Sequence, residues 1–206
     1  MKDSTVRDFL ASVAAATPTP GGGSVSALAA ALSVALARMV AGLAREKRGY
    51  EDSQPAIRQL EDRAKAVQER FEALVDEDAR AYDSVLSAMS QPRSTDAERA
   101  ARVEHMQAAY RRAAEIPLET MRLGVEALEL AELAAEKGNR SATTDAGVAI
   151  LLAEAAIRGA SLNCRVNLAS IRDEAFRTSA EKEMQDLLAK AQTVGHRAMG
   201  LVEGRL

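Results

Sequence analysis

The sequence of 206 residues lacks most of the residues that build metal centres and disulfide frameworks. It contains a single cysteine, Cys164, and two histidines, His105 and His196, which lie far apart in the chain. One thiol cannot form an intramolecular disulfide, and two distant imidazoles do not make a metal cluster, so we expect no bound metal. A chain without disulfides is typical of the reducing cytoplasm, where we expect this protein.

The sequence also lacks any region with an excess of charge of one sign. The 27 lysines and arginines are interleaved with 30 aspartates and glutamates, for a net charge of −3. No basic stripe results, which argues against nucleic acid and anionic membranes as partners. Hydrophobic residues make up 47% of the chain, enough for the core of one domain, and we expect residues 1–206 to form a single domain.

One stretch, Val25 to Ala44, is long and apolar enough to raise the question of a membrane span. Much of it is alanine, which favours insertion only weakly, and Arg38 would lie at hydrocarbon depth at a cost of about 3 kcal/mol. We therefore predict a buried helix of a soluble protein that makes no membrane contact.

Strand patterns are absent, since no sustained alternation of polar and apolar residues rich in Val, Ile or Thr occurs. Helical periodicity runs through nearly the whole chain and predicts an all-α protein. Pro117 either kinks a helix or begins a new one, and Gly138 or Asn139 is a natural left-handed helix stop. The expected helices cover about 4–15, 24–45, 52–90, 95–117 with a continuation to 137, 143–171 and 173–202.

Two of these helices, 24–45 and 143–171, are apolar around nearly their whole circumference. Ser24 and either Thr143 or Thr144 are expected as their N-caps. Small residues allow close helix packing, so we place both helices in the centre and wrap them with long amphipathic helices. The predicted fold is an all-α helical bundle with two central alanine-rich helices.

Asp78 stands out on the predicted core seam of the helix 52–90. The other seam positions recur at spacings of three and four: Ile57, Leu60, Ala64, Val67, Phe71, Leu74, Tyr82, Val85 and Met89. A buried carboxylate without a partner is strongly unfavourable, so Asp78 must be paired, hydrated in a cleft or protonated. It is a functional carboxylate with a shifted pKa, an ion-pair partner of an arginine, or a half-exposed residue out of phase by one position.

Three further polar residues lie in the second apolar helix. Asp145, near its start, favours the helix dipole, and capping explains it more simply than catalysis does. Asn163 and Asn167 are four residues apart and share one face, where each amide requires hydrogen-bond partners. The two amides either bind a polar heterocycle or link neighbouring helices.

The stretch Thr17–Val40 begins with two prolines and three glycines, and Gly21–Gly23 lead directly into Ser24. This backbone can approach a ligand closely, and the helix start offers unpaired N–H groups to an anion. The Walker spacing is absent, so a carboxylate or polar ring edge is a better ligand than a nucleotide phosphate, unless the segment is only a flexible turn. Lys47 and Arg48 either bind an anionic ligand or are solvated.

Five segments of the chain read FLASVAAATPTPGGGSVSALAAAL, LVDEDARAY, AAEIPLE, EKGNRSATTDAGVA and GASLNCRVNL. Together, in order and spacing, they resemble the cyclodeaminase/cyclohydrolase family of folate one-carbon metabolism, and the resemblance covers nearly the whole chain. The family includes the cyclodeaminase half of formiminotransferase-cyclodeaminase and stand-alone methenyltetrahydrofolate cyclohydrolases. The Pro-Thr-Pro-Gly-Gly-Gly-Ser signature is specific in this context.

The resemblance implies an all-helical homodimeric enzyme that needs no cofactor and acts on the carbon between N5 and N10 of tetrahydrofolate. It implies a formimidoyltetrahydrofolate cyclodeaminase, which forms 5,10-methenyltetrahydrofolate and releases ammonia by general acid–base catalysis, or, alternatively, a methenyltetrahydrofolate cyclohydrolase that uses the same site. Asp78 would be the proton shuttle and counter-charge, and Asp145 the second carboxylate. The residues implied for folate binding are Pro20, Gly21, Gly22, Gly23, Ser24, Lys47, Asn139, Asn163 and Asn167.

The segment AREKRGY, residues 44–50, departs from the Thr-x-Gly-Lys-Lys-Lys-Tyr pattern usual after the second helix of the family. It keeps Lys47 and Tyr50. The departure favours a further alternative, a non-catalytic folate-binding protein that kept the bundle. A purely structural helical dimer is favoured if no cleft exists beside the glycine turn.

Overall fold

The structure, a computed structural model, describes Met1 and residues 3–206. Every regular element in these residues is helical, which confirms the predicted all-α class. The helices are α1 (Val6–Ala14), α2 (Gly22–Gly42), α3 (Gln54–Met89), α4 (Asp96–Lys137), α5 (Thr143–Leu168) and α6 (Glu174–Glu203), with the short 3₁₀ turns η1 (Glu51–Ser53) and η2 (Arg140–Ala142).

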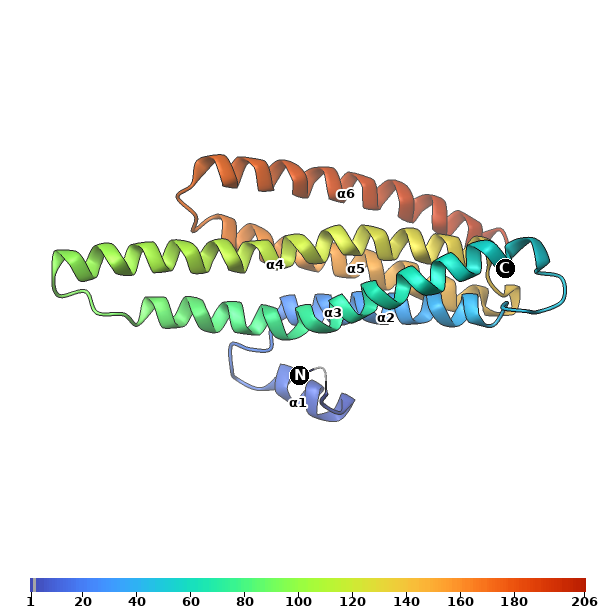
Figure 1. Cartoon of the computed structure of the whole chain (residues 1–206), viewed down its shortest axis with the longest axis horizontal. Helices are drawn as coiled ribbons and strands as arrows, with labels where there is room; N and C mark the ends of the chain where they lie inside the picture. Colours follow the sequence, from blue (N-terminus) through green and yellow to red (C-terminus); the bar gives the residue numbers. More distant parts are fainter. Residues whose placement is uncertain (2) are drawn as a thin grey trace.

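Helices α2 to α5 form a bundle in which each helix runs back along the preceding one (Figure 1). A buried hydrogen bond joins α2 and α5, in which Ser33 Oγ donates to Ala149 O at 2.7 Å. Helix α6 packs on the outside against α4 and α5. Helix α1 lies beside the bundle and contributes Phe9 to the core.

Helices α2 and α5 carry many small side chains and lie in the core of the bundle, as predicted. Ala30 and Ala37 of α2 and Ala149 and Ala153 of α5 are fully buried. By length and composition, α2 could span a membrane, and so could residues 140–168, a second segment that the sequence pattern did not single out. Half of each apolar window is buried inside the bundle, and the core helix of a soluble protein passes the same test.

Helices α3 and α4 are joined along their length by three ion pairs at seven-residue intervals, here called the α3–α4 ladder. The rungs are Arg63 with Glu126, Arg70 with Glu119 at 2.6 Å, and Glu77 with Arg112 at 2.8 Å. Seven residues are about two helical turns, so the rungs follow one seam between the two helices. The ladder holds α4 beside the half of α3 that carries Asp78.

The two predicted N-caps of the apolar helices are wrong. The N-cap of α2 is Gly21, and Ser24 lies inside the helix, where its hydroxyl bonds to α3 instead. The N-cap of α5 is Ala142, while the hydroxyl of Thr143 donates to Arg140 O at 2.7 Å. In both cases the hydroxyl donates to a backbone carbonyl, so it does not accept the helix N–H that the local pattern predicts.

The predicted left-handed stop after α4 is also wrong. Gly138 has a φ of −77° and Asn139 a φ of −66°, both outside the left-handed region. A side chain at position 138 would overlap Ala134 O and Val40. Glycine is therefore required there for close packing against α2 and not for its backbone conformation.

Pro117 lies inside α4, which continues through it as one helix from Asp96 to Lys137, so no new helix begins there. The N-cap of α4 is Thr95, where the expected helix begins. Its hydroxyl accepts a hydrogen bond from the backbone N–H of Glu98 at 3.2 Å, and the Glu98 carboxylate bonds back to Thr95, as in a capping box.

Candidate active site

A cleft of about 220 Å³ opens where α2 begins, at one end of the four-helix part of the bundle, and α3 and α4 extend beyond it (Figure 1). It lies between the turn before α2 and the helices α3, α4 and α5. Six predicted site residues line it, and Pro20 and Ser24 flank the same turn. The lining residues are Pro18, Thr19, Gly21, Gly22, Gly23, Asp78, Ala81, Tyr82, Ala113, Asn163, Val166 and Asn167. A cleft does therefore exist beside the glycine turn, and the feature that would favour a purely structural dimer is not found.

Asp78, on α3, faces the first turn of α2. Ser24 Oγ lies 3.1 Å from Asp78 Oδ2 and 2.9 Å from Val75 O. A Cβ atom on Gly23 would overlap the carboxylate, so only glycine permits this approach. The glycine segment thus allows α2 to begin directly against the carboxylate, which explains why it precedes a long apolar helix.

Burial raises the pKa of Asp78 above its ordinary value, and hydrogen bonds from the hydroxyl and backbone N–H of Ser24 partly oppose the rise. No ion pair to Asp78 is formed within the described part of the chain, so the pairing with an arginine that the sequence left open does not occur. A carboxylate of this kind exchanges its proton closer to neutral pH than a surface aspartate does. That property suits general acid–base catalysis.

Asn163 and Asn167 lie on one face of α5 and line the cleft, as their spacing predicts. Nδ2 of Asn163 donates to Gly159 O of the same helix at 2.9 Å. Nδ2 of Asn167 donates to Ala113 O of α4 at 2.8 Å. Asn167 therefore links two helices and at the same time faces the space that a ligand would occupy.

Tyr82 and Val166 are cleft residues that the sequence pattern did not predict. Tyr82 follows Asp78 by one turn of α3 and is 42% exposed, and Val166 of α5 is 72% exposed. The spacing of Tyr82 fits the core seam, which is why the pattern assigns it to the core. Its position four residues after the outlying carboxylate is the signal that could have placed it in the site.

Asp145, Asn139 and Lys47 lie at the opposite end of the bundle from the cleft. Helix α2 has 21 residues and so spans about 30 Å between the glycine turn and that end. There Nδ2 of Asn139 donates to Leu43 O at 2.8 Å, Lys47 is exposed, and Asp145 is half-buried in the first turn of α5. Within one chain, none of the three joins Asp78 in the cleft.

The histidine, acidic and cysteine side chains of the described residues show neither a metal cluster nor an exposed thiol. Over residues 1 and 3–206, no cluster of three or more His, Cys, Asp or Glu side chains is placed to hold a metal ion. Cys164 is buried, and burial raises the pKa of its thiol to about 11, so the thiol is protonated near neutral pH. In the cleft itself, Asp78 is the acidic side chain.

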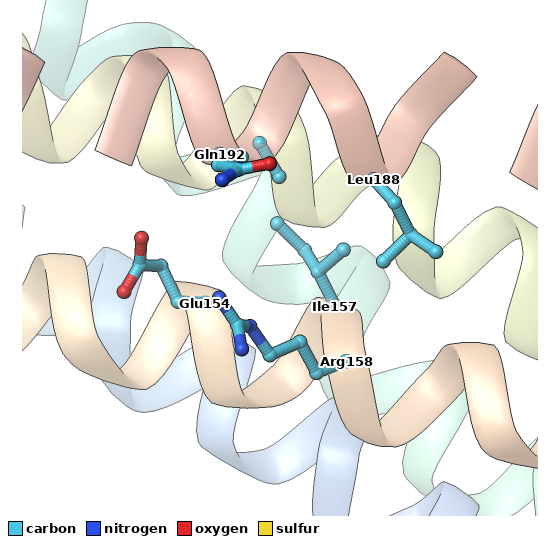
Figure 2. A pocket seen from close by; sticks show the side chains of 6 residues that line it. Glu154, Ile157, Arg158, Leu188 and Gln192 are labelled. Carbon is cyan, nitrogen blue, oxygen red and sulfur yellow. The ribbon is translucent and has the colours of Figure 1, made fainter. Parts of the chain in front are cut away.

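A second cleft, of about 350 Å³, lies between α5 and α6 (Figure 2). Glu154 and Arg158 of α5 face Gln192 of α6 across it, and the rest of its lining is apolar. A side chain at Gly195 would overlap the Glu154 carboxylate, so glycine there allows α6 to pack closely on α5. This cleft contains none of the residues that the sequence predicts for the site.

Comparison with known proteins identifies the family. A family model described as formiminotransferase-cyclodeaminase matches residues 5–186, most of the chain. The chain belongs to this family. The matched range contains the glycine turn, Asp78 and both cleft asparagines, and the match confirms the resemblance carried by the five sequence segments.

Relatives of this formiminotransferase-cyclodeaminase family member bear two kinds of enzyme name. A methenyltetrahydrofolate cyclohydrolase of Methylorubrum extorquens is 36% identical over 98% of the chain and 97% of its own length. A formimidoyltransferase-cyclodeaminase of Rattus norvegicus is 32% identical over 98% of the chain, which spans 38% of that longer protein. The crystal structure of a formiminotetrahydrofolate cyclodeaminase of Thermotoga maritima has a TM-score of 0.89 and 29% identity, with 98% of both chains covered.

Proposed function

We propose that this family member hydrolyses 5,10-methenyltetrahydrofolate in the cleft at Asp78. The observation that carries the proposal is a half-buried carboxylate whose pKa is raised by burial, held against the glycine turn in an open cleft. The Methylorubrum extorquens relative supports hydrolysis, because the two chains match over nearly their whole lengths.

The chemistry of hydrolysis uses Asp78 twice. Water adds to the cationic methenyl carbon between N5 and N10, and the new C–O bond forms as the water gives a proton to the carboxylate. One C–N bond then breaks, its electron pair returns to nitrogen, and the protonated Asp78 supplies the proton to that nitrogen. The hydroxyl group becomes the formyl C=O and its proton is released to solvent, which is the net proton that the hydrolysis produces. Before water attacks, the same negative charge faces the cationic carbon and stabilises the bound substrate.

Cyclodeamination is the second candidate, and the Thermotoga maritima structure favours it. In that reaction N10 attacks the formimidoyl carbon on N5, and the bond from this carbon to the leaving nitrogen breaks. The formimidoyl group reacts in its protonated form, so its nitrogen carries two hydrogens, and Asp78 accepts the proton from N10 and gives it to this nitrogen, which departs as ammonia. Both reactions require one base, one acid and a charge opposite the methenyl cation, so one site suits either.

The substrate ring would lie between the glycine turn and α5. Gly21–Gly23 leave room for a flat ring against the backbone, and Asn163 and Asn167 provide amides for its polar edge. The ring face can pack on Tyr82, since aromatic side chains favour flat heterocycles. This placement brings the reacting carbon toward Asp78.

We also propose that the enzyme is a homodimer formed through the outer faces of α2 and α5. Large apolar side chains are exposed on both faces. On α2 they recur every two turns, as at a helix interface, at Val25, Leu32 and Met39, and on α5 they are Val148, Leu151, Leu162 and Val166. A two-fold axis across this face would exchange the bundle ends. The Lys47 and Asp145 end of one copy would then lie near the cleft of the other, where a lysine and a second carboxylate have the roles implied by the family resemblance.

The remaining expectations for this enzyme follow from its composition. We propose a soluble cytoplasmic protein that uses no metal or other cofactor and binds neither nucleic acid nor membrane. The interleaved charges support the last two expectations, because the sequence has no basic stripe that would bind a phosphate backbone or an anionic lipid surface. Its small-molecule partner is a tetrahydrofolate derivative.

An absorbance assay of methenyltetrahydrofolate tests the proposal. Purified protein is given methenyltetrahydrofolate to follow its loss, and then the formimidoyl substrate to follow its appearance, with Asp78→Asn measured in parallel. We expect turnover by the wild type and at least a hundredfold loss in the variant. Binding without turnover of either substrate would instead identify the non-catalytic folate-binding protein that the altered segment 44–50 favours.

A further inference from the structure

Pro117 has a specific relation to the cleft. In a regular helix the N–H of residue 117 would donate to the carbonyl of residue 113, but proline has no N–H. The carbonyl of Ala113 instead accepts a hydrogen bond from Nδ2 of Asn167 at 2.8 Å, and Ala113 and Asn167 both line the cleft. The carbonyl that proline leaves free is therefore the one that holds a cleft side chain.

We infer that Pro117 is a positioning residue that orients the amide of Asn167, so that the cleft presents a row of hydrogen-bond acceptors. With Nδ2 of Asn167 held by Ala113 O, the other end of the amide, Oδ1, is directed away from α4. In the described part of the chain, no hydrogen bond to this oxygen is formed. It is left available to a ligand.

Asn163 is held in the same way from its own helix. Its Nδ2 donates to Gly159 O at 2.9 Å, and its Oδ1 has no partner among the described residues. The two amide oxygens give the cleft a row of two acceptors on α5, beside the carboxylate of Asp78 that is assigned to the reacting carbon. One N–H of each amide is engaged by a backbone carbonyl, which fixes the direction in which the amide oxygen points.

An acceptor row of this kind selects ligands whose edge carries hydrogen-bond donors. A site built to accept from an N–H group rejects an analogue that offers an oxygen there, because two acceptors then face each other. Combined with the proposed function, on which this step rests, the row would bind the amino and N–H groups of the reduced pteridine ring. The row would therefore favour the 2-amino edge of the folate ring over a 2-oxo edge in the same position.

The positioning role is tested with Pro117→Ala, Asn167→Ala and the double variant. Alanine at 117 restores an N–H that competes for Ala113 O, so we expect KM for methenyltetrahydrofolate to rise roughly two- to tenfold, with kcat nearly unchanged. The unfolding temperature should stay equal or rise, because proline is unfavourable inside a helix. In the Asn167→Ala background the proline substitution should have no further effect on KM.

A second readout does not depend on activity. In ¹⁵N-labelled wild type the side-chain NH₂ protons of Asn167 should exchange slowly with solvent. In Pro117→Ala we expect their exchange rate to rise roughly two- to tenfold, as KM does. Equal exchange in both proteins overturns the positioning role even if neither folate substrate is turned over. Slow exchange lost on substitution, in a protein inactive on both substrates, retains the positioning role and rejects the proposed function.

Two small inhibitors test the acceptor row itself. The probes are 2-amino-4-oxopteridine and 2,4-dioxopteridine, which differ in the donor or acceptor at position 2. We expect the amino compound to inhibit wild-type turnover at least tenfold more strongly than the dioxo compound. In Pro117→Ala the ratio of the two inhibition constants should be smaller. Equal inhibition by the two compounds, or none by either, would contradict the row. Additive effects of Pro117→Ala and Asn167→Ala on KM would show that Pro117 does not act through Asn167.

Discussion

The two ends of the bundle carry asparagines with opposite hydrogen-bonding states. At the far end Asn139 is buried, its Nδ2 donates to Leu43 O at 2.8 Å, and its Oδ1 accepts from the N–H of Ser141 at 3.0 Å. At the cleft end Asn163 and Asn167 use only their donors and are partly exposed.

The difference shows how one residue type can serve structure or binding. An amide with both ends engaged by the backbone fixes a turn, and removing it leaves buried polar groups unpaired. An amide with one end held and the other free is oriented toward a ligand. Four substitutions test whether this contrast between the two ends holds.

Asp78→Asn should have the largest effect. Because the variant cannot shuttle a proton, we expect kcat/KM to fall roughly 10²- to 10⁴-fold in the methenyltetrahydrofolate assay. Asp83→Asn, an exposed aspartate on the same helix and outside the cleft, is the matched control and should retain activity. Comparable rates in wild type and Asp78→Asn would remove the catalytic role from the cleft end.

The same variant should not be less stable at neutral pH. The pKa of Asp78 is raised from its ordinary value of 3.8, so the folded protein holds this proton more tightly than the unfolded chain does. Stability is therefore lost as the pH rises through the folded-state pKa, and asparagine avoids that loss. The unfolding temperature of Asp78→Asn should equal or exceed that of wild type at pH 7, and the difference between the two temperatures should shrink toward pH 4.

Gly23→Ala should have the next largest effect, roughly tenfold to a hundredfold on kcat/KM. Its methyl group would overlap the Asp78 carboxylate and displace the reacting group from its position. Gly200→Ala is the control, since nothing lies within 4 Å of a Cβ there, and it should raise stability by about 1 kcal/mol. Steady-state kinetics and thermal unfolding are measured on both variants. If Gly23→Ala had the same kcat/KM and unfolding temperature as Gly200→Ala, the proposed contact would be wrong.

Tyr82→Ala should raise KM roughly five- to a hundredfold with a smaller change in kcat. Stacking of a flat ring on an aromatic side chain contributes about 1–3 kcal/mol, and alanine removes it. Leu86→Ala lies one turn further along α3, is exposed to a similar degree and is outside the cleft, so its KM should match wild type. If both variants shifted KM equally, the effect would come from α3 and not from the ring.

Asn139→Ala should change activity least. It leaves Leu43 O and the N–H of Ser141 without partners, so we expect a stability loss of about 1–3 kcal/mol in denaturant unfolding. The kcat should stay within twofold of wild type. A large rise in KM at unchanged stability would give Asn139 the folate-binding role implied by the family resemblance and reverse the comparison.

Periodicity was enough to find the fold and the central carboxylate. Asp78 is visible in the sequence because it interrupts a seam of apolar residues at helical spacing, and the glycine turn is visible because three glycines precede a helix. Both signals are local. The pairing of α2 with α3, which joins the two features, comes from long-range packing that one sequence does not specify.

The remaining site features depend on contacts between distant residues. The sequence predicts a kink or a break at Pro117 because proline removes one backbone hydrogen bond of the helix. Asn167, 50 residues later in the chain, supplies a hydrogen bond to the carbonyl that is left free. Ser24 reads as a cap because its bond to α3 is not local. The family resemblance supplied Asn139, Lys47 and Asp145 as site residues, but their place in one chain could not be read from spacing, since helix length sets it.

The α3–α4 ladder has a consequence for how the chain can misfold. Its first two rungs place arginine on α3, and the third places arginine on α4. Sliding one helix past the other by seven residues would oppose Arg70 and Arg112 in one direction, and Glu77 and Glu119 in the other. Either slip sets like charges face to face, so the reversal of sign at the third rung disfavours both neighbouring alignments of a long and otherwise repetitive helix pair.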